Sequence, residues 1–299
     1  MNVRNSIRNL MCLGAGVAMA FTATTAQADI SWAAGAPDGT GGGSAFFDQT
    51  GGLSVLSTGI ATNQLLTQGI NGTGASSEDY TISFWFNRDG LNGSSNNGEA
   101  WIIGSGDLGV NNFNTRGLHL GFTNANSGNL TQAHWSADQT GTTSVSASGW
   151  EHATFTYDGD GGTGGTTGFG SIYINGVLDT EGDQNGAFRD AGNLIIGSRV
   201  GGAGPSYNGR IDDLAIFNTV LDSSQVETLF NDTTQALALG AGAYYDFEDD
   251  QTGTTAAVQG TGLDAIDLAG ITATAVPEPS SLAILLGLGI AGLTRRKRS

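Results

Sequence analysis

Tyr80-Thr81-Ile82-Ser83-Phe84-Trp85-Phe86 is a run of β-branched and aromatic residues, which is the composition of a β-strand. Other short apolar runs occur along the chain between turns rich in Gly, Asn, Ser and Thr, and helical periodicity is almost absent. These further predicted strands are residues 100–104, 118–122, 153–157, 171–174, 194–196 and 211–217. Many short strands separated by such turns predict an all-β sandwich.

Local signals predict one hairpin turn, one helix and one long loop. Asn175-Gly176 lies between two predicted strands and is typical of a type I′ turn, in which both central residues need positive φ. A helix is predicted over Ser223–Asn231, because Asp222 can serve as its N-cap with Gln225 at the capping-box position. Residues 158–170 are rich in Gly and Thr, which favours a loop over a calcium-binding repeat or a phosphate loop.

An ordered set of short motifs carries a family resemblance. In chain order these are Tyr80–Trp85, Trp150–Ala153, Tyr157–Gly159, Ile172–Gly176, Ile195–Gly197, Tyr207–Asp213 and Phe217-Asn218. From about residue 44 to residue 231 the chain resembles a LamG-like domain. The resemblance implies a concanavalin A-like lectin/glucanase jelly roll with a short helix after Leu221. It also leads us to expect that Ala243–Phe247 adds a closing strand beside the N-terminal one.

The N-terminus has the three parts of a secretory signal peptide. Arg4 and Arg8 supply the positive charge, residues 10–21 are apolar, and Ala26 and Ala28 form a small-x-small cleavage site. We therefore expect an N-terminal signal helix, cleavage by signal peptidase and export of the chain.

The C-terminus carries a second targeting signal. Pro277-Glu278-Pro279 breaks any preceding structure, residues 281–293 form an apolar run, and Arg295-Arg296-Lys297-Arg298 follows at the end. This arrangement resembles the PEP-CTERM sorting signal. The resemblance implies an apolar anchor helix held only transiently in the inner membrane, cleavage by an exosortase-type enzyme, and delivery to the cell surface or extracellular matrix. The alternative is a short tail anchor that stays in place.

These signals divide the chain into a signal peptide (1–28), a sandwich domain (29–275) and a sorting signal (276–299). The single cysteine, Cys12, lies in the signal peptide, so the exported chain has neither disulfides nor thiol chemistry. Its body holds 27 acidic and 5 basic residues, a net charge of −22. Such a surface repels nucleic acid and anionic lipid, so neither is expected as a partner.

We expect that the body binds extracellular polysaccharide. Sugar rings pack on aromatic faces, and Trp101, Trp135 and Tyr207 have polar neighbours in sequence, as does Trp32. We therefore predict that one of Trp101, Trp135 or Tyr207 contacts a glycan.

A structural calcium ion is a further expectation, because hard cations prefer carboxylate and carbonyl oxygens. The candidate ligands are Asp48 together with Asp212 or Asp213. Asp212 and Asp213 are adjacent, so on a strand their side chains face opposite ways. The alternative is that both accept backbone hydrogen bonds at a bend in the strand.

Catalytic residues are not predicted. Glycosidases use two carboxylates at a defined separation, and no Glu-x-Asp-x-x-Glu run occurs. The alternating carboxylates Asp246, Glu248 and Asp250 are interpreted as a strand end entering a turn. The histidines His119, His134 and His152 are interpreted as structural. A non-catalytic binding protein is therefore expected, with a glycan-cleaving hydrolase and a purely structural matrix protein as the alternatives.

Overall fold

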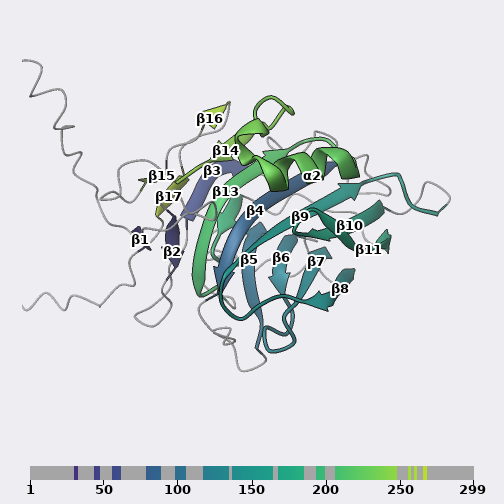
Figure 1. Cartoon of the computed structure of the whole chain (residues 1–299), viewed down its shortest axis with the longest axis horizontal. Coiled ribbons are helices and arrows are strands. Elements are labelled where there is room, and N and C mark those ends of the chain that lie inside the picture. Colours follow the sequence, from purple (N-terminus) through teal and green to yellow (C-terminus); the bar gives the residue numbers. More distant parts are fainter. Residues whose placement is uncertain are drawn as a thin grey trace, which may run out of the picture.

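Two antiparallel β-sheets lie face to face and form a sandwich in this computed structural model (Figure 1). The structure describes residues 30–32, 44–47, 56–61, 79–88, 98–105, 117–134, 137–163, 168–184, 193–198, 206–247, 255–256, 259–260 and 265–267. The prediction of an all-β sandwich is confirmed. The predicted signal and anchor helices lie outside the described residues, and no described helix is long and apolar enough to cross a membrane.

Sheet A contains the strand predicted at residues 80–86. In spatial order its strands are β1 (Ile30–Trp32), β2 (Ala45–Phe47), β13 (Gly209–Phe217), β4 (Tyr80–Arg88), β9 (Trp150–Asp158), β10 (Gly168–Ile174) and β11 (Val177–Gln184). A further strand, β14 (Ala243–Tyr245), pairs with β13 and with β16 (Gln259–Gly260).

Sheet B supplies the second layer. In spatial order its strands are β15 (Thr255–Ala256), β17 (Ala265–Asp267), β3 (Leu56–Ala61), β12 (Asn193–Ile196), β5 (Ala100–Ser105), β6 (Leu118–Phe122), β7 (Asn129–His134) and β8 (Asp138–Ser144). The sequence analysis did not predict β7 and β8, because their polar residues do not show the apolar runs of the other strands.

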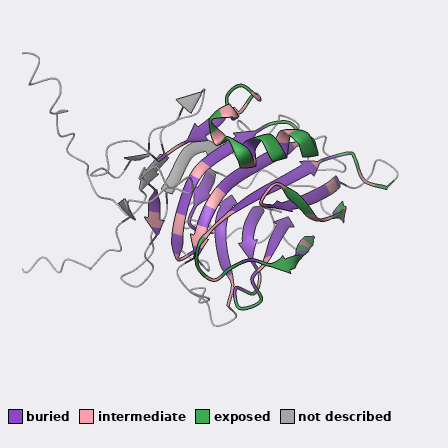
Figure 2. Cartoon of the chain, viewed as in Figure 1, coloured by how far each residue is buried: buried purple, intermediate pink, exposed green. Residues whose placement is uncertain are grey.

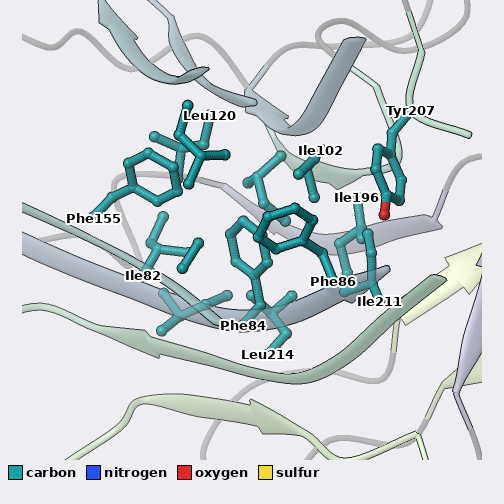
Figure 3. Packing of buried hydrophobic residues seen from close by; sticks show 14 of the residues in the cluster. Ile82, Phe84, Phe86, Ile102, Leu120, Phe155, Ile196, Tyr207, Ile211 and Leu214 are labelled. Carbon is teal, nitrogen blue, oxygen red and sulfur yellow. The ribbon is translucent and has the colours of Figure 1, made fainter. Parts of the chain in front are cut away.

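The main core lies between the sheets and is centred on β4. Ile82, Phe84 and Phe86 alternate along β4 and point into this core, where the Phe84 and Phe155 rings stack with centroids 6.0 Å apart (Figure 3). The intervening residues of β4 face the other side of sheet A. Thr81 and Ser83 are nevertheless buried, because a helix covers that side.

The helix α2 (Ser223–Asn231) lies across the outer face of sheet A (Figures 1 and 2). Val226 and Leu229 pack into a second apolar cluster with Phe217. The predicted capping box is confirmed. Asp222 Oδ1 accepts the Gln225 N–H at 2.9 Å, and Gln225 Oε1 accepts the Asp222 N–H at 2.9 Å. A short 3-10 helix, η2 (Thr233–Gln235), follows.

The predicted hairpin is confirmed, since Asn175 and Gly176 join β10 to β11 with φ of 52° and 77°. The prediction of a loop over residues 158–170 is wrong at its C-terminal end, because β10 begins at Gly168. A Cβ at Gly168 would lie 2.1 Å from the hydroxyl oxygen of Tyr157. Glycine is therefore present in this strand because a neighbouring ring needs the space. In the sequence, such a glycine cannot be distinguished from a glycine of a loop.

The C-terminal strand corrects a further expectation. β14 does not pair with the N-terminal strand. Tyr245 lies opposite Leu214 of β13, while β2 pairs with β13 around Gly209–Ile211. Both short strands thus occupy successive parts of one edge of β13, because its other edge is taken by β4.

Candidate functional site

Two of the three aromatic residues predicted to contact a glycan are buried. Trp101 is 3% exposed; its indole N–H donates to Glu99 Oε2 at 3.4 Å, and its ring lies 5.4 Å from that of His119. Tyr207 is 1% exposed, and its hydroxyl donates to the Arg210 carbonyl at 3.1 Å. Trp135 lies outside the described residues. Neither described ring offers a face to solvent, so the groove described below is a better platform.

The predicted calcium ligands lie at a bend of β13. Asp213 has a φ of 52°, and the pairing of β13 with β4 is irregular between Asp212 and Ala215. Asp212 Oδ1 accepts the Asp213 N–H at 2.9 Å, as expected for a carboxylate that stabilises a strand bend. Asp48 lies outside the described residues.

Asp213 accepts hydrogen bonds from two hydroxyl groups, that of Thr233 at 2.8 Å and that of Tyr244. Burial, followed by the negative charge of Asp213, raises the pKa of Tyr244, so this hydroxyl stays protonated and can donate. Within the described part of the chain, no group of three or more His, Asp or Glu residues is arranged to hold a metal ion. The calcium site stays a prediction.

The three histidines are buried and contact other side chains. His134 Nε2 lies 2.8 Å from the Tyr80 hydroxyl, and His152 Nε2 lies 2.9 Å from Ser83 Oγ. Burial lowers the pKa of His152 to about 3, so its imidazole is neutral near pH 7. Of the alternating carboxylates, Asp246 is partly buried, whereas Glu248 and Asp250 lie outside the described residues.

A groove lies between the β10–β11 turn and α2, and the sequence analysis did not predict it. Its volume is about 510 Å³, within the range of pockets that bind small molecules. The groove is lined by Asn175, Gly176, Val177, Leu178, Ser223, Ser224, Glu227, Phe230 and Asn231. The turn and the helix thus each contribute apolar and polar groups.

Hydrogen bonds fix the turn side of the groove. Asn175 Nδ2 donates to Glu151 Oε2 at 2.5 Å, and Asn175 Oδ1 accepts the His152 N–H at 2.8 Å. Phe230 packs on the neighbouring ring of Trp85, with centroids 5.6 Å apart. A Cβ at Gly176 would lie 3.1 Å from Phe230, so the turn glycine allows this close approach. The groove is therefore built on rigid contacts to sheet A.

Apolar and polar groups meet along the groove. Val177 is 69% exposed and Leu178 is 42% exposed, and both line it. Glu227, also in the lining, is exposed on α2. Exposed aliphatic side chains that adjoin a hollow are typical of binding sites. A sugar ring suits this surface, because its C–H faces contact apolar groups while its hydroxyls bond to amides, hydroxyls and carboxylates.

One sequence signal for this site exists. Two adjacent apolar residues follow the Asn175-Gly176 turn, and alternation along a strand predicts that at least one of them faces away from the core. In the structure both are exposed. Only the position of α2 turns this exposed pair into the side of a groove.

The two-sheet sandwich with one helix across sheet A is a jelly roll of the lectin type. A laminin G-type family profile, described as the concanavalin A-like lectin/glucanases superfamily, matches residues 58–227. The chain belongs to this superfamily, and its resemblance to LamG-like domains is confirmed. The PEP-CTERM protein-sorting motif matches residues 275–298, which identifies an exported protein with a membrane-associated sorting signal.

Solved structures similar to this chain have low sequence identity to it. One similar structure is that of a putative carbohydrate-binding protein from Bacteroides ovatus, which is 17% identical to this chain with a TM-score of 0.51. The match covers 84% of this chain and 61% of that protein. This chain thus spans about three-fifths of that protein. Domain 4 of an arabinanase from Geobacillus stearothermophilus is 20% identical with a TM-score of 0.43, covering 67% of this chain and 80% of that domain. The comparison with curated proteins returned no match.

Proposed function

We propose that this protein is exported to the cell surface or extracellular matrix, where it binds polysaccharide without cleaving it. The observation that carries the proposal is the groove beside α2, in which exposed aliphatic residues adjoin amide, hydroxyl and carboxylate groups. These are the groups that a polysaccharide chain needs from a binding surface.

Charge narrows the class of ligand. The body carries a net charge of −22, which repels polymers rich in uronate or sulfate. Glu227 adds a carboxylate within the groove itself. We therefore infer a neutral polysaccharide, whose hydroxyl groups donate to this carboxylate.

The sorting motif and the superfamily support the proposal. The motif implies processing by an exosortase-type enzyme and release from the inner membrane toward the surface. The Bacteroides ovatus protein, which shares the fold, is itself described as a putative carbohydrate-binding protein. Because a fold alone does not fix an activity, the groove must be tested directly.

The test incubates the purified protein with neutral exopolysaccharide from the producing organism and measures both retention and new reducing ends. Leu178→Ser is compared with Leu237→Ser, an equally exposed leucine (40% against 42%) that does not line the groove. We expect about tenfold weaker binding for Leu178→Ser alone, a change of about 1.4 kcal/mol. Equal binding by the two variants would remove the groove from the proposal.

The same assay distinguishes the alternatives. New reducing ends would identify a hydrolase and direct attention to Asp246, Glu248 and Asp250. If the polysaccharide is neither retained nor cleaved, the result would favour a structural matrix protein. The predicted calcium ion is tested separately by thermal unfolding, because an ion bound only to the folded state raises the Tm. An unchanged Tm at millimolar calcium would contradict that prediction.

A further inference from the structure

Three glutamine side chains converge beside Gly170 at the edge where the sheets meet. They come from β7 (Gln132), β8 (Gln139) and β11 (Gln184). A Cβ at Gly170 would lie 2.6 Å from Gln139 Oε1, 2.8 Å from Gln132 Oε1 and 3.0 Å from Gln184 Cδ. The three carboxamides therefore share one small space, which the glycine keeps open.

Two of these side chains are fixed through their amide nitrogens. Gln132 Nε2 donates to the Tyr80 hydroxyl at 2.6 Å and to the Thr156 carbonyl at 3.0 Å. Gln184 Nε2 donates to the Gln132 carbonyl at 3.1 Å. Because the amide nitrogens have these acceptors, the orientation of each carboxamide is fixed by its hydrogen bonds.

The oxygens themselves accept no hydrogen bond. Within the described residues, Oε1 of Gln132, Gln139 and Gln184 is buried and lacks a donor. Gln132 is 0% exposed and Gln184 is 2% exposed, whereas Gln139 is partly exposed. Buried acceptors without a donor are rare in proteins, because their desolvation is not compensated. Three such oxygens on side chains that share one space would suit a positively charged occupant.

The surroundings favour a cation. β8 and β11 flank the cluster and contain no lysine or arginine, whereas they carry Asp138, Asp179, Glu181 and Asp183. All three converging groups are neutral carboxamides, and each offers a carbonyl oxygen. Calcium and magnesium sites in proteins use carboxylates, whereas carbonyl oxygens alone can replace the hydration shell of a monovalent ion. We propose that Gln132, Gln139 and Gln184 bind one alkali cation, Na⁺ or K⁺, between the two sheets.

The bound cation links β11 to β8. Both ends of β11 then have a role, since Val177 and Leu178 line the groove at one end and Gln184 reaches the cation at the other. The Asp179 carboxylate already ties these strands together, because it accepts the N–H groups of Thr142 and Thr143 at 2.9 Å each. The cation site is independent of the proposed polysaccharide binding and does not require it.

The first test measures the Tm of the full protein in NaCl, KCl or tetramethylammonium chloride, each at about 200 mM. Methyl groups shield the charge of tetramethylammonium from coordination by carbonyl oxygens, so this salt controls for ionic strength. For a Kd of about 10 mM, we expect a Tm about 4 °C higher in NaCl or KCl. Equal Tm values in the three salts would overturn the proposal, and would assign the cluster to a hydrogen-bond network in which Gln139 donates its amide.

The second test uses isosteric charge variants. Gln139→Glu replaces one neutral oxygen with a carboxylate, so calcium should now raise the Tm more than it does in the parent protein. Gln225→Glu is the matched control, because it adds the same charge in the capping box of α2, far along the chain from the cluster. The same calcium response in both variants would contradict the proposed site. Gly170→Ala fills the shared space and should abolish the difference between the salts.

Discussion

His152 makes the stability of this protein depend on pH in a defined window. The side chain is fully buried, and its Nε2 is paired with Ser83 Oγ at 2.9 Å. Burial lowers its pKa from 6.5 to about 3. In the unfolded chain the imidazole takes up a proton below about pH 6.5, whereas in the folded protein it stays neutral until about pH 3. The stabilisation is therefore complete above pH 6.5 and decreases as the pH falls.

The magnitude follows from the separation of the two pKa values. Each pH unit inside the window changes the free energy of unfolding by about 1.4 kcal/mol. Acidification from about pH 7 to about pH 5 should thus cost about 2 kcal/mol through His152 alone, by the same relation. For a domain of this size, the loss corresponds to a decrease in Tm of about 4 to 8 °C.

The assay compares the pH dependence of unfolding in the parent protein and in His152→Gln, which keeps a hydrogen-bonding group but does not titrate. Carboxylates titrate in both proteins, so the difference between the two curves reports the histidine. We expect the variant to be less stable at neutral pH but to lose about 2 kcal/mol less on acidification to about pH 5. If the free energies of unfolding of the two proteins depend on pH in the same way, the conclusion that the buried imidazole is neutral would be refuted.

Three further changes test how the sandwich is held together. Asp179→Ala removes three hydrogen bonds to β8 and should cost about 2 to 3 kcal/mol in urea unfolding, whereas Glu181→Ala on the same strand should be nearly neutral. Phe84→Ala should cost about 3 to 5 kcal/mol, because its ring is fully buried between the sheets, and a loss below about 1 kcal/mol would contradict this packing. Asp222→Ala should lower the Tm and reduce the helical signal in circular dichroism, while an unchanged Tm and helical signal would contradict the capping box.

Local chemistry explains which predictions the structure confirmed. The β4 run, the Asn175-Gly176 turn and the Asp222 cap each depend on residues close together in sequence, whose conformational preferences act over a few residues. The same holds for the sorting motif at residues 275–298, which is read as a linear signal. Polar strands such as β7 and β8 were not predicted, because their residues form strands only through pairing with neighbouring strands.

The sequence by itself determined the all-β class, the C-terminal sorting motif and the acidic charge of the body, because composition and short motifs carry that information. Only the tertiary structure decided the sites. It buried Trp101 and Tyr207, joined Val177 to α2 in a groove, and brought three distant glutamines together beside Gly170. Long-range packing sets these contacts, and no pattern within a single strand specifies which residues of another strand will face it.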